Sequence, residues 1–264
     1  MLAIANNLNF NNREFLSAVR TGNHDWIARQ ALALKAAGAD MLAVSLSLDG
    51  DGDEKYIKTA VAGAREAGLT LSIDSRNPKA QEIAAETAGG KIIVNYLSAD
   101  YQREKEMTGI LSAAASAGAD LVIYPLRKGV PADADERLGI IEDLIEKANA
   151  AGISNDRLIV DLVVLHMAGN VRGQEQAVAV QEALYGLNEL VEPPIRTTCW
   201  LSNISAGSTS DIRAAINGTY LAMLAGLGLW SAYIDVLNKE TMRTVRLIRA
   251  FKNEVVYSQA DAAA

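Results

Sequence analysis

The stretch Ala36-Ala37-Gly38-Ala39-Asp40-Met41-Leu42-Ala43-Val44 contains the pattern that decides the fold of this chain. A helix of small residues ends at a glycine, and a short apolar run follows at once. Glycine readily takes the left-handed conformation that ends a helix, and a short apolar run is typical of a parallel strand buried on both faces. The pattern returns at Glu66-Ala67-Gly68, Ala117-Gly118-Ala119-Asp120 and Ala150-Ala151-Gly152, each time before another apolar run.

This repeated helix-to-strand unit predicts a closed (β/α)8 TIM barrel in a single domain. Strands are expected at Leu2 to Ala5, Met41 to Ser45, Thr70 to Asp74, Ile92 to Asn95, Leu121 to Tyr124, Leu158 to Asp161, Thr197 to Leu201 and Ala232 to Asp235. Amphipathic helices are expected at Trp26 to Ala37, Tyr56 to Ala67, Lys79 to Thr87, Glu104 to Ala117, Glu136 to Ala150, Glu175 to Leu190, Ile212 to Leu224 and Glu240 to Phe251. An open sheet of this size would need two edges and a reversal that the sequence does not mark. We expect the barrel to span residues 1–258 and residues 259–264 to fray.

Composition excludes several classes of protein. The chain has 264 residues, 50% of them hydrophobic, and a net charge of −7, which argues against disorder and against a surface for nucleic acid or an anionic membrane. One cysteine and two histidines leave too few ligands for a Cys- or His-based metal site. The start of the chain does not resemble a signal peptide, and the longest apolar window, Tyr220 to Trp230, is shorter than the ~20 residues of a membrane-spanning helix. A cytoplasmic protein is expected.

Polar residues end several of the predicted strands. In a barrel of this kind the chemistry lies at the carboxyl ends of the strands, so these residues are expected to share one pocket. A carboxylate there reads adjacent N–H and NH₂ donors, and amides serve ring carbonyls and ring nitrogens. The set predicts a pocket for a flat polar heterocycle such as a pterin, whereas a phosphate ligand fits worse because no Gly-rich phosphate loop is present. The residues are Asp74, Asn95, Asp161, Ser202, Asn203 and Asp235.

Each of these residues also has a purely structural explanation. Asp74 precedes Asn77-Pro78, a good helix start, and organising that turn is an alternative role. Loop amides are alternative partners for Asp161, Asn95 and Asp235. The other candidate side chains, His166 and Cys199, fit structural roles better, the cysteine as a core residue.

Five segments together resemble the methyltetrahydrofolate:corrinoid methyltransferases, a family of pterin-binding barrels. The family includes the acetogenic corrinoid iron-sulfur protein methyltransferase, the folate domain of cobalamin-dependent methionine synthase and methyltransferases of anaerobic demethylation. The resemblance runs from Met1 to about Ser258, and the Leu-Ser-Asn segment is its most specific part. The segments are Ile73-Asp74-Ser75, Val94-Asn95, Ile159-Val160-Asp161, Leu201-Ser202-Asn203 and Asn217-Gly218-Thr219-Tyr220-Leu221-Ala222-Met223.

The resemblance implies roles for individual residues. Asp74, Asn95 and Asp161 match the residues that read the pterin, with Ser202 beside them, and Asn203 matches the asparagine that approaches N5 of the folate. Asn203 and Asp74 are accordingly the expected catalytic residues. Basic residues near the strand ends are expected to attract the glutamate tail of the folate. They are Arg76, Arg127 and Arg213.

The resemblance also implies an activity and a partner. The expected reaction moves a methyl group between a protein-bound methylcorrinoid and N5 of tetrahydrofolate, and we favour transfer from the methylcorrinoid to tetrahydrofolate in an anaerobic demethylation system. Tetrahydrofolate and 5-methyltetrahydrofolate are then substrates. Neither His24 nor His166 lies in the Asp-x-His-x-x-Gly pattern of cobalamin-binding modules, so a separate corrinoid protein is the expected partner. A homodimer is the family expectation.

The sequence departs from the family pattern in three places, and other functions stay open. Asn6-Asn7-Leu8-Asn9 lacks the usual acidic-basic pair, Ala43 and Ser45 stand where Asp and Asn are common, and Trp200 replaces a glycine. The alternatives are transfer from methyltetrahydrofolate to a Co(I) corrinoid protein, a dihydropteroate synthase-like activity, and a non-catalytic folate-binding subunit. Against the synthase, its expected strand-seven lysine is absent, and Asp235 stands where a basic group belongs.

Overall fold

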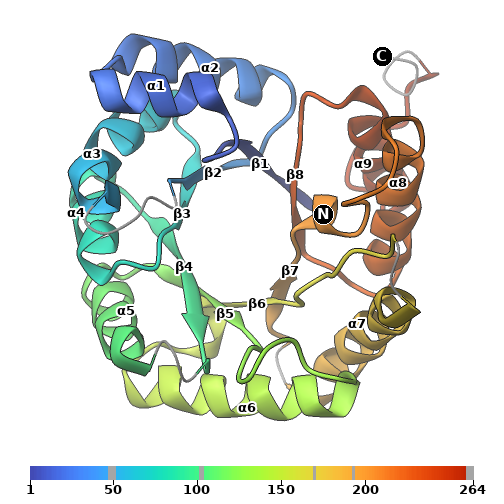
Figure 1. Ribbon diagram of the computed structural model, residues 1–264. Helices are drawn as coiled ribbons and strands as arrows, with labels where there is room; N and C mark the ends of the chain where they lie inside the picture. The colour runs from blue at the N-terminus through green and yellow to red at the C-terminus, as the bar shows by residue number, and fades with distance from the viewer. Residues whose placement is uncertain (47–51, 101–103, 169–170, 192–193, 260–264) are drawn as a thin grey trace.

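The computed structural model describes residues 1–46, 52–100, 104–168, 171–191 and 194–259 of the chain. Its parallel strands form one eight-stranded sheet that curls into a barrel, and helices surround it (Figure 1). The predicted (β/α)8 fold is therefore confirmed. The strands are β1 (Leu2–Leu8), β2 (Met41–Ser45), β3 (Thr70–Asp74), β4 (Ile92–Ser98), β5 (Asp120–Tyr124), β6 (Leu158–Asp161), β7 (Arg196–Thr198) and β8 (Ser231–Ile234).

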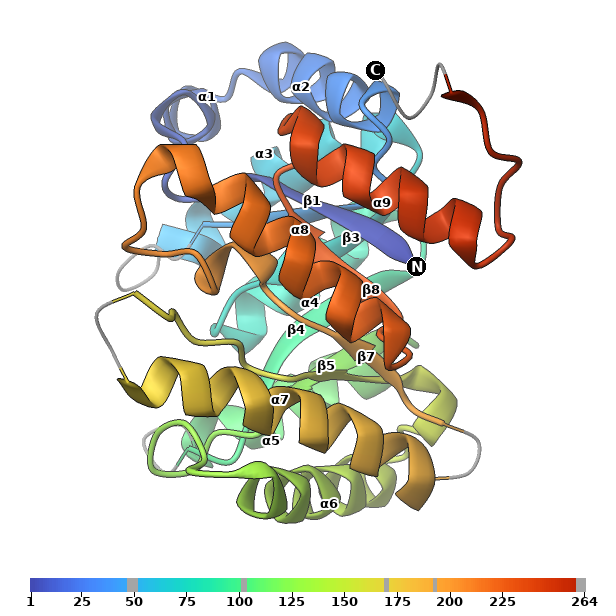
Figure 2. The same cartoon turned by 90° about the vertical axis from the view of Figure 1, so that its right-hand side faces the viewer.

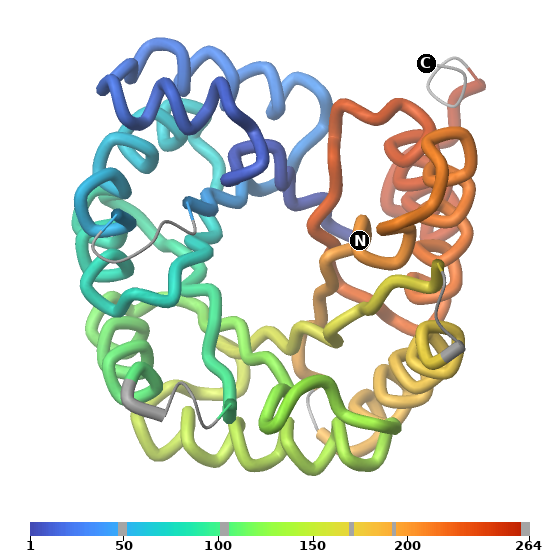
Figure 3. The backbone as a smooth tube through the Cα atoms, in the orientation of Figure 1, coloured from blue at the N-terminus to red at the C-terminus, as the bar shows by residue number. Residues whose placement is uncertain are grey.

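The barrel closes through two different kinds of contact. β1 pairs with β2 on one side and with β8 on the other, both in parallel. Between β7 and β8 the described residues form no ladder but an isolated β-bridge from Trp200 to Tyr233, in which the Tyr233 N–H donates to the carbonyl of Cys199 over 2.8 Å. The backbone trace in Figure 3 shows the resulting ring. Trp200 thus lies at the place where the barrel is joined.

The helices cover the outside of the barrel (Figure 2). They are α1 (Arg13–Thr21), α2 (His24–Ala36), α3 (Gly52–Ala64), α4 (Pro78–Ala88), α5 (Glu104–Ser116), α6 (Ala134–Ala150), α7 (Val171–Leu190), α8 (Ser210–Gly226) and α9 (Lys239–Phe251). Short 3-10 segments are η1 (Arg65–Ala67), η3 (Asn155–Arg157) and η4 (Leu201–Asn203). None of the described helices has the length and apolar character needed to cross a bilayer.

The eight predicted helices did not include α1, which is an additional helix before β2. Its N-cap is Asn12, whose side chain accepts a hydrogen bond from the N–H of Phe15. Phe15, Ala18 and Val19 are its buried residues. This three- and four-residue spacing is that of an amphipathic helix, so the signal was present in the sequence but is only about two turns long.

Strand seven is shorter than expected and ends at Thr198. Its last ladder partner is Asp161, the final residue of β6, so the chain has no further strand to pair with on that side. After the bridge at Trp200 the backbone turns into η4, where the N–H of Asn203 donates to the carbonyl of Trp200. Ser202 and Asn203 therefore lie on a 3-10 turn beyond the strand, and both are exposed.

Alternation along each strand separates two cores. In β6, Leu158 and Val160 pack in the large cluster between sheet and helices, while Ile159 belongs to a separate cluster. Successive strand side chains point to opposite faces, so Ile159 and Asp161 both face the barrel interior. The same alternation places Ser72 and Asp74 of β3 on the interior face. The polar residues at the carboxyl end thus lie above an interior layer that contains both apolar residues such as Ile159 and the hydroxyl group of Ser72.

Candidate functional site at the carboxyl end of the barrel

Asp161 is a fully buried carboxylate with unused hydrogen-bonding capacity. Its Oδ1 accepts the N–H of Val163 over 2.7 Å, whereas Oδ2 has no hydrogen-bond partner in the described part of the chain. Burial raises the pKa of Asp161 to about 7, opposed by the Val163 hydrogen bond and the charge of Arg137. The nearby Asp74 carboxylate raises this pKa further. A buried acceptor of this kind is suited to a ligand that brings N–H donors.

Arg137 of α6 supports the backbone next to Asp161 from the outer side. The guanidinium is fully buried and donates to the carbonyl of Leu162 over 2.9 Å and to Oε1 of Gln176 over 2.7 Å. Gln176 in turn donates to the carbonyls of Pro131 and Ala132. This network fixes the residue that follows Asp161, so the direction of its carboxylate is set by buried contacts.

Asp74 ends β3 in register with Asn95 of β4 and Ser45 of β2. The hydroxyl of Ser45 donates to Oδ2 of Asp74 over 2.8 Å. Asn77 is itself the N-cap of α4, because its side chain accepts from the N–H groups of Lys79 and Ala80. The helix start that offered a structural role for Asp74 therefore has its own cap. Ser45, where the family usually has an asparagine, serves here as a partner for Asp74.

Asn95 is fully buried in a network of hydroxyl groups inside the barrel. The hydroxyl of Tyr124 donates to its Oδ1 over 2.8 Å, and its Nδ2 donates to the hydroxyl of Tyr233 over 3.0 Å. Tyr233 also shares a 2.8 Å hydrogen bond with Ser72. The partners of the Asn95 side chain are thus tyrosine and serine hydroxyls and not loop amides. Burial raises the pKa of both tyrosines, which keeps them protonated as donors.

Sequence reasoning missed Tyr124, Tyr233, Ser72 and Trp200 as parts of this site. Ser72 precedes the selected Asp74 by two residues within β3, so strand alternation places that pair on one face. Tyr233 likewise precedes Asp235, which lies one residue beyond the end of β8 at Ile234 and not within the strand as expected. Tyr124 and Trp200 have no such neighbour in the sequence. Alternation was therefore the available signal for half of this set.

Ser202 and Arg213 line a cleft of about 490 Å³ between η4, the start of α8 and the β8–α9 connection. Asn217 and Asp235 line the same cleft, and Asp235 accepts a 2.6 Å hydrogen bond from Nδ2 of Asn7. The N–H of Met167 donates to the carbonyl of Ile204, which ties the β6–α7 connection to the segment after Asn203. The loop that follows Asp161 is thus joined to the loop that carries Asn203.

The three selected arginines have different surroundings. Arg76 lies over the ring of Tyr96 at 5.6 Å, and that ring stacks on Tyr124. Arg127 forms an ion pair with Asp143 of α6. Arg213 donates from Nε to the carbonyl of Ser208 and lines the cleft. Arg76 is therefore joined to the interior network through Tyr96, and Arg127 is already paired.

The remaining polar candidates give no metal centre in the described segments. No group of three or more His, Cys, Asp and Glu residues there is arranged to hold a metal ion. Cys199 is fully buried in the main core, which confirms its assignment as a core residue, and burial raises its thiol pKa. His166 is exposed on the β6–α7 connection.

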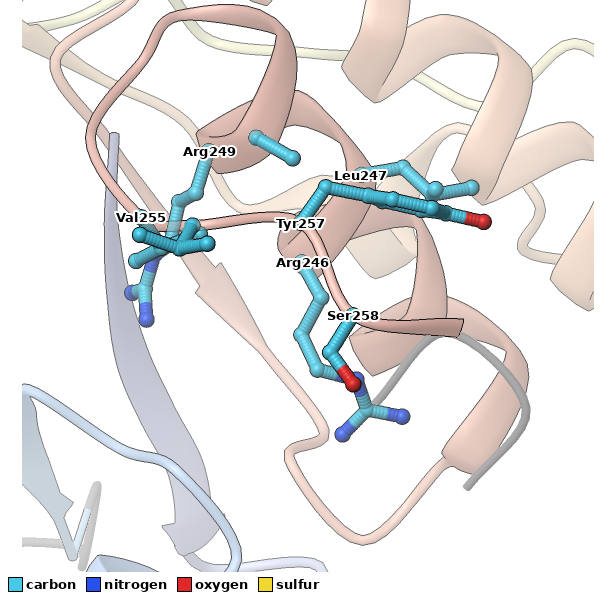
Figure 4. A pocket seen from close by; sticks show the side chains of 8 residues that line it. Arg246, Leu247, Arg249, Val255, Tyr257 and Ser258 are labelled. Atoms are coloured by element: carbon cyan, nitrogen blue, oxygen red, sulfur yellow. The ribbon is translucent and has the colours of Figure 1, made fainter. Parts of the chain in front are cut away.

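A second pocket, of about 160 Å³, lies at the other end of the barrel. It is formed where the segment Val255–Ser258 passes over α9 beside Arg246, Leu247 and Arg249 (Figure 4). Arg249 donates to the carbonyl of Met1, which places this pocket beside the start of β1. In barrels of this type that end contributes to stability, so we do not assign it to the functional site.

Comparison with solved structures shows the same fold in several dihydropteroate synthases. The enzyme of Yersinia pestis, solved with a pterine-sulfa conjugate, superposes with a TM-score of 0.68 at 18% identity, covering 96% of this chain and 94% of that one. The Xanthomonas albilineans enzyme in complex with 7,8-dihydropteroate gives a TM-score of 0.67 at 18% identity, covering 95% and 93%. At this identity the likeness concerns the fold.

Sequence comparison finds methionine synthases. This chain is 25% identical over 193 residues to the enzyme of Mycobacterium tuberculosis, a match that covers 70% of this chain and 16% of the relative. The Mycobacterium leprae enzyme is 24% identical over 184 residues, covering 66% and 15%. The chain thus spans about a sixth of the length of the curated relatives it matches.

The fold and the site define a (β/α)8 barrel with a buried, partly unpaired carboxyl group, Asp161, at the end of β6 and a cleft beside the ends of β7 and β8. A family model described as pterin binding enzyme matches residues 6–235. The chain belongs to this family of pterin-binding enzymes, and the predicted pterin-binding barrel is confirmed at that level.

Proposed function

We propose that this protein is a methyltransferase that moves a methyl group between a corrinoid bound to another protein and N5 of tetrahydrofolate. The observation that carries the proposal is the buried carboxyl group of Asp161, whose Oδ2 has no partner among the described residues. The match to methionine synthases over most of this chain supports a folate methyl transfer. We favour transfer from the methylcorrinoid to tetrahydrofolate, and the reverse direction uses the same site.

Asp161 matches the donor pattern of a pterin. The pyrimidine ring of a pterin carries an N–H next to an exocyclic NH₂, and a carboxylate accepts from both at once. Each carboxylate oxygen has two acceptor positions, so the Val163 hydrogen bond leaves Oδ1 with one of them. Asp74 and Asn95 lie in register on neighbouring strands, and the remaining acceptor position of Asn95 Oδ1 is assigned to the second hydrogen of the same NH₂ group.

Asn203 is assigned to the reacting nitrogen. Transfer between N5 and cobalt is a displacement in line with the methyl group, so the rate depends on how rigidly the pterin is held. The charge on N5 changes during transfer, and an amide held beside it stabilises that change. Asn203 is exposed on η4, on the loop that begins after the barrel bridge at Trp200, where an approaching corrinoid has access.

The corrinoid is assigned to a partner protein and acts as the second substrate. The sequence lacks the Asp-x-His-x-x-Gly pattern of cobalamin-binding modules. We predict that the partner is a separate corrinoid protein and that this protein forms a homodimer. Sedimentation of the protein alone and with its corrinoid partner tests both predictions.

A dihydropteroate synthase-like activity is the second candidate, because the solved structures that share this fold include such synthases. The lysine expected on strand seven is absent: residues 196–204 contain Arg196 and no lysine. Formation of 7,8-dihydropteroate from 4-aminobenzoic acid and an activated dihydropterin tests this candidate directly.

The proposed function is tested by following the absorbance of methylcobalamin in the presence of tetrahydrofolate, and of Co(I) cobalamin with methyltetrahydrofolate. We expect conversion in at least one direction, and a loss of about 2 to 3 kcal/mol in tetrahydrofolate binding for Asp161→Asn. Asp135→Asn, an exposed aspartate of α6, is the matched control and should bind normally. Binding without conversion in either direction would favour a non-catalytic folate-binding subunit.

A further inference from the structure

Trp200 stands where the resembling family has a glycine, and its indole lies within the hydrogen-bonded interior of the barrel. One face stacks on Tyr233, with ring centroids 4.3 Å apart and an interplanar angle of 4°. Its Nε1 donates to the hydroxyl of Tyr124 over 2.9 Å. Tyr124 and Tyr233 are the two tyrosines that contact the Asn95 carboxamide, so Trp200 touches both.

The indole N–H fixes which groups donate and which accept in this hydrogen-bond network. An indole N–H donates and never accepts, so the hydroxyl oxygen of Tyr124 is the acceptor in its contact with Trp200. The single proton of Tyr124 is then available for Oδ1 of Asn95. Nδ2 of Asn95 consequently faces Tyr233, whose hydroxyl is shared with Ser72. A side chain without an N–H at position 200 would remove the group that orients the chain of donors.

The oriented carboxamide offers a ligand only one kind of group. Nδ2 donates to Tyr233 over 3.0 Å and approaches Ser72 Oγ at 3.5 Å, so both of its hydrogens point into the protein. Oδ1 accepts from Tyr124 and keeps one acceptor position. Asn95 and Asp161 therefore both present acceptors, and a ligand edge rich in N–H donors complements them.

We propose that Trp200 is a positioning residue that acts through Tyr124 on the Asn95 carboxamide and makes the pocket select a 2-amino pteridine over its 2-oxo analogue. The proposal rests on the proposed function, because it names the ligand edge that the same site reads. The half-buried indole also joins β7 to β8 at the barrel bridge. Trp200 thus couples barrel closure to ligand selection.

The first test compares the dissociation constants of pterin and of lumazine, which has an oxygen in place of the 2-amino group. We expect Trp200→Phe, which keeps an aromatic ring and removes the N–H, to reduce the preference for pterin by about tenfold. Trp200→His, which retains a ring N–H, should restore part of the preference. Trp230→Phe, at the residue just before β8 with Arg196 over its ring, is the matched control. A melting curve for each variant separates selection from stability.

The second test needs no ligand. The side-chain amide protons of Asn95, identified by their loss in Asn95→Asp, should shift in the NMR spectrum of Trp200→Phe and stay in place in Trp230→Phe. If the wild-type protein binds neither pteridine but these protons shift, the pterin function fails and the orienting role of Trp200 stands. If pterin binds, and both the preference and the Asn95 protons are unchanged in a folded Trp200→Phe, the proposal is overturned.

Discussion

The main-chain N–H of Val163 donates to Oδ1 of Asp161 across 2.7 Å, and Val163 adopts a φ of 53° in this arrangement. A left-handed backbone is costly for a β-branched residue and is maintained only where surrounding contacts enforce it. Here the buried Arg137 holds the carbonyl of the intervening Leu162. The carboxylate is thus anchored through one oxygen, and the other has no hydrogen-bond partner among the described residues.

The buried Asp161 should make folding stability depend on pH. Its pKa of about 7 in the folded protein lies above its ordinary value of 3.8, so the folded state binds more protons than the unfolded state between these values. The contribution of Asp161 to the free energy of unfolding is therefore fully present below pH ~4 and falls by up to about 1.4 kcal/mol per pH unit up to pH ~7. The free energy of unfolding is measured by urea denaturation at each pH for the wild type and for Asp161→Asn. The difference between the two proteins isolates the slope that Asp161 contributes. A difference that is flat from pH 4 to 7 would contradict the assignment.

Pterin binding should become tighter as the pH rises through about 7, the pKa of Asp161. The ionised carboxylate accepts two charge-assisted hydrogen bonds from a pterin, whereas the protonated form loses one acceptor position. We expect the dissociation constant for tetrahydrofolate to fall by up to about tenfold per pH unit below that pKa and to level off above it. Calorimetry at fixed ionic strength measures this, with Asp161→Asn as the variant that should lack the dependence.

Asn203→Ala should separate binding from catalysis. If the amide stabilises the charge change at N5, the variant should bind tetrahydrofolate almost normally and transfer methyl groups roughly 10²- to 10³-fold more slowly. If Asn203 only orders the turn after Trp200, the melting temperature should drop, and affinity and rate should decline modestly and together. Single-turnover transfer from methylcobalamin at saturating folate, beside a melting curve, distinguishes the two. Early melting with a near wild-type rate would end the catalytic assignment.

Binding of the glutamate tail of the folate should depend on Arg76 and Arg213 more than on Arg127. Arg127 is paired with Asp143, whereas Arg76 lies over Tyr96 and Arg213 lines the cleft beside Ser202. Affinity should fall with rising salt, and Arg76→Gln with Arg213→Gln should flatten that dependence. Arg127→Gln serves as the control for each of the two single variants, because it also removes one positive charge. Unaltered salt dependence in the double variant would place the tail elsewhere.

Replacing either of two helix glycines with alanine should change the stability of the fold, and the two changes should have opposite signs. A Cβ at Gly63 of α3 would lie 2.6 Å from Cβ of Ile27 in α2, so Gly63→Ala should destabilise the fold by about 1 to 3 kcal/mol. A Cβ at Gly139 of α6 meets nothing within 4 Å, and Gly139→Ala should stabilise by about 0.5 to 1 kcal/mol. Thermal melts of the pair check the packing of α2 on α3. Equal shifts for the two variants would be inconsistent with it.

The periodicity of the sequence by itself determined the barrel. Repeated helix ends at glycine followed by short apolar runs are local patterns, and a helix-to-strand repeat of this length has few ways to bury its strands on both faces. The same patterns placed Asp74 and Asp161 at strand ends, which the ends of β3 and β6 bear out. The expected end of the fourth strand at Asn95 was wrong, because β4 continues to Ser98 by pairing with β5. The short helix α1 was not predicted, because two helical turns carry only a weak periodic signal.

Only the tertiary structure decided which side chains meet at the carboxyl end. Trp200 and Tyr124 are 76 residues apart in the sequence, and their hydrogen bond depends on the curvature that brings β5 and the end of β7 into one ring. The end of β7 depended on its neighbours, because β6 ends at Asp161, the ladder partner of Thr198. The raised pKa of Asp161 likewise depends on burial, since desolvation is a property of everything packed around a group. Local patterns specify elements, while hydrogen-bond partners and ionisation are set by distant residues that the closed barrel brings together.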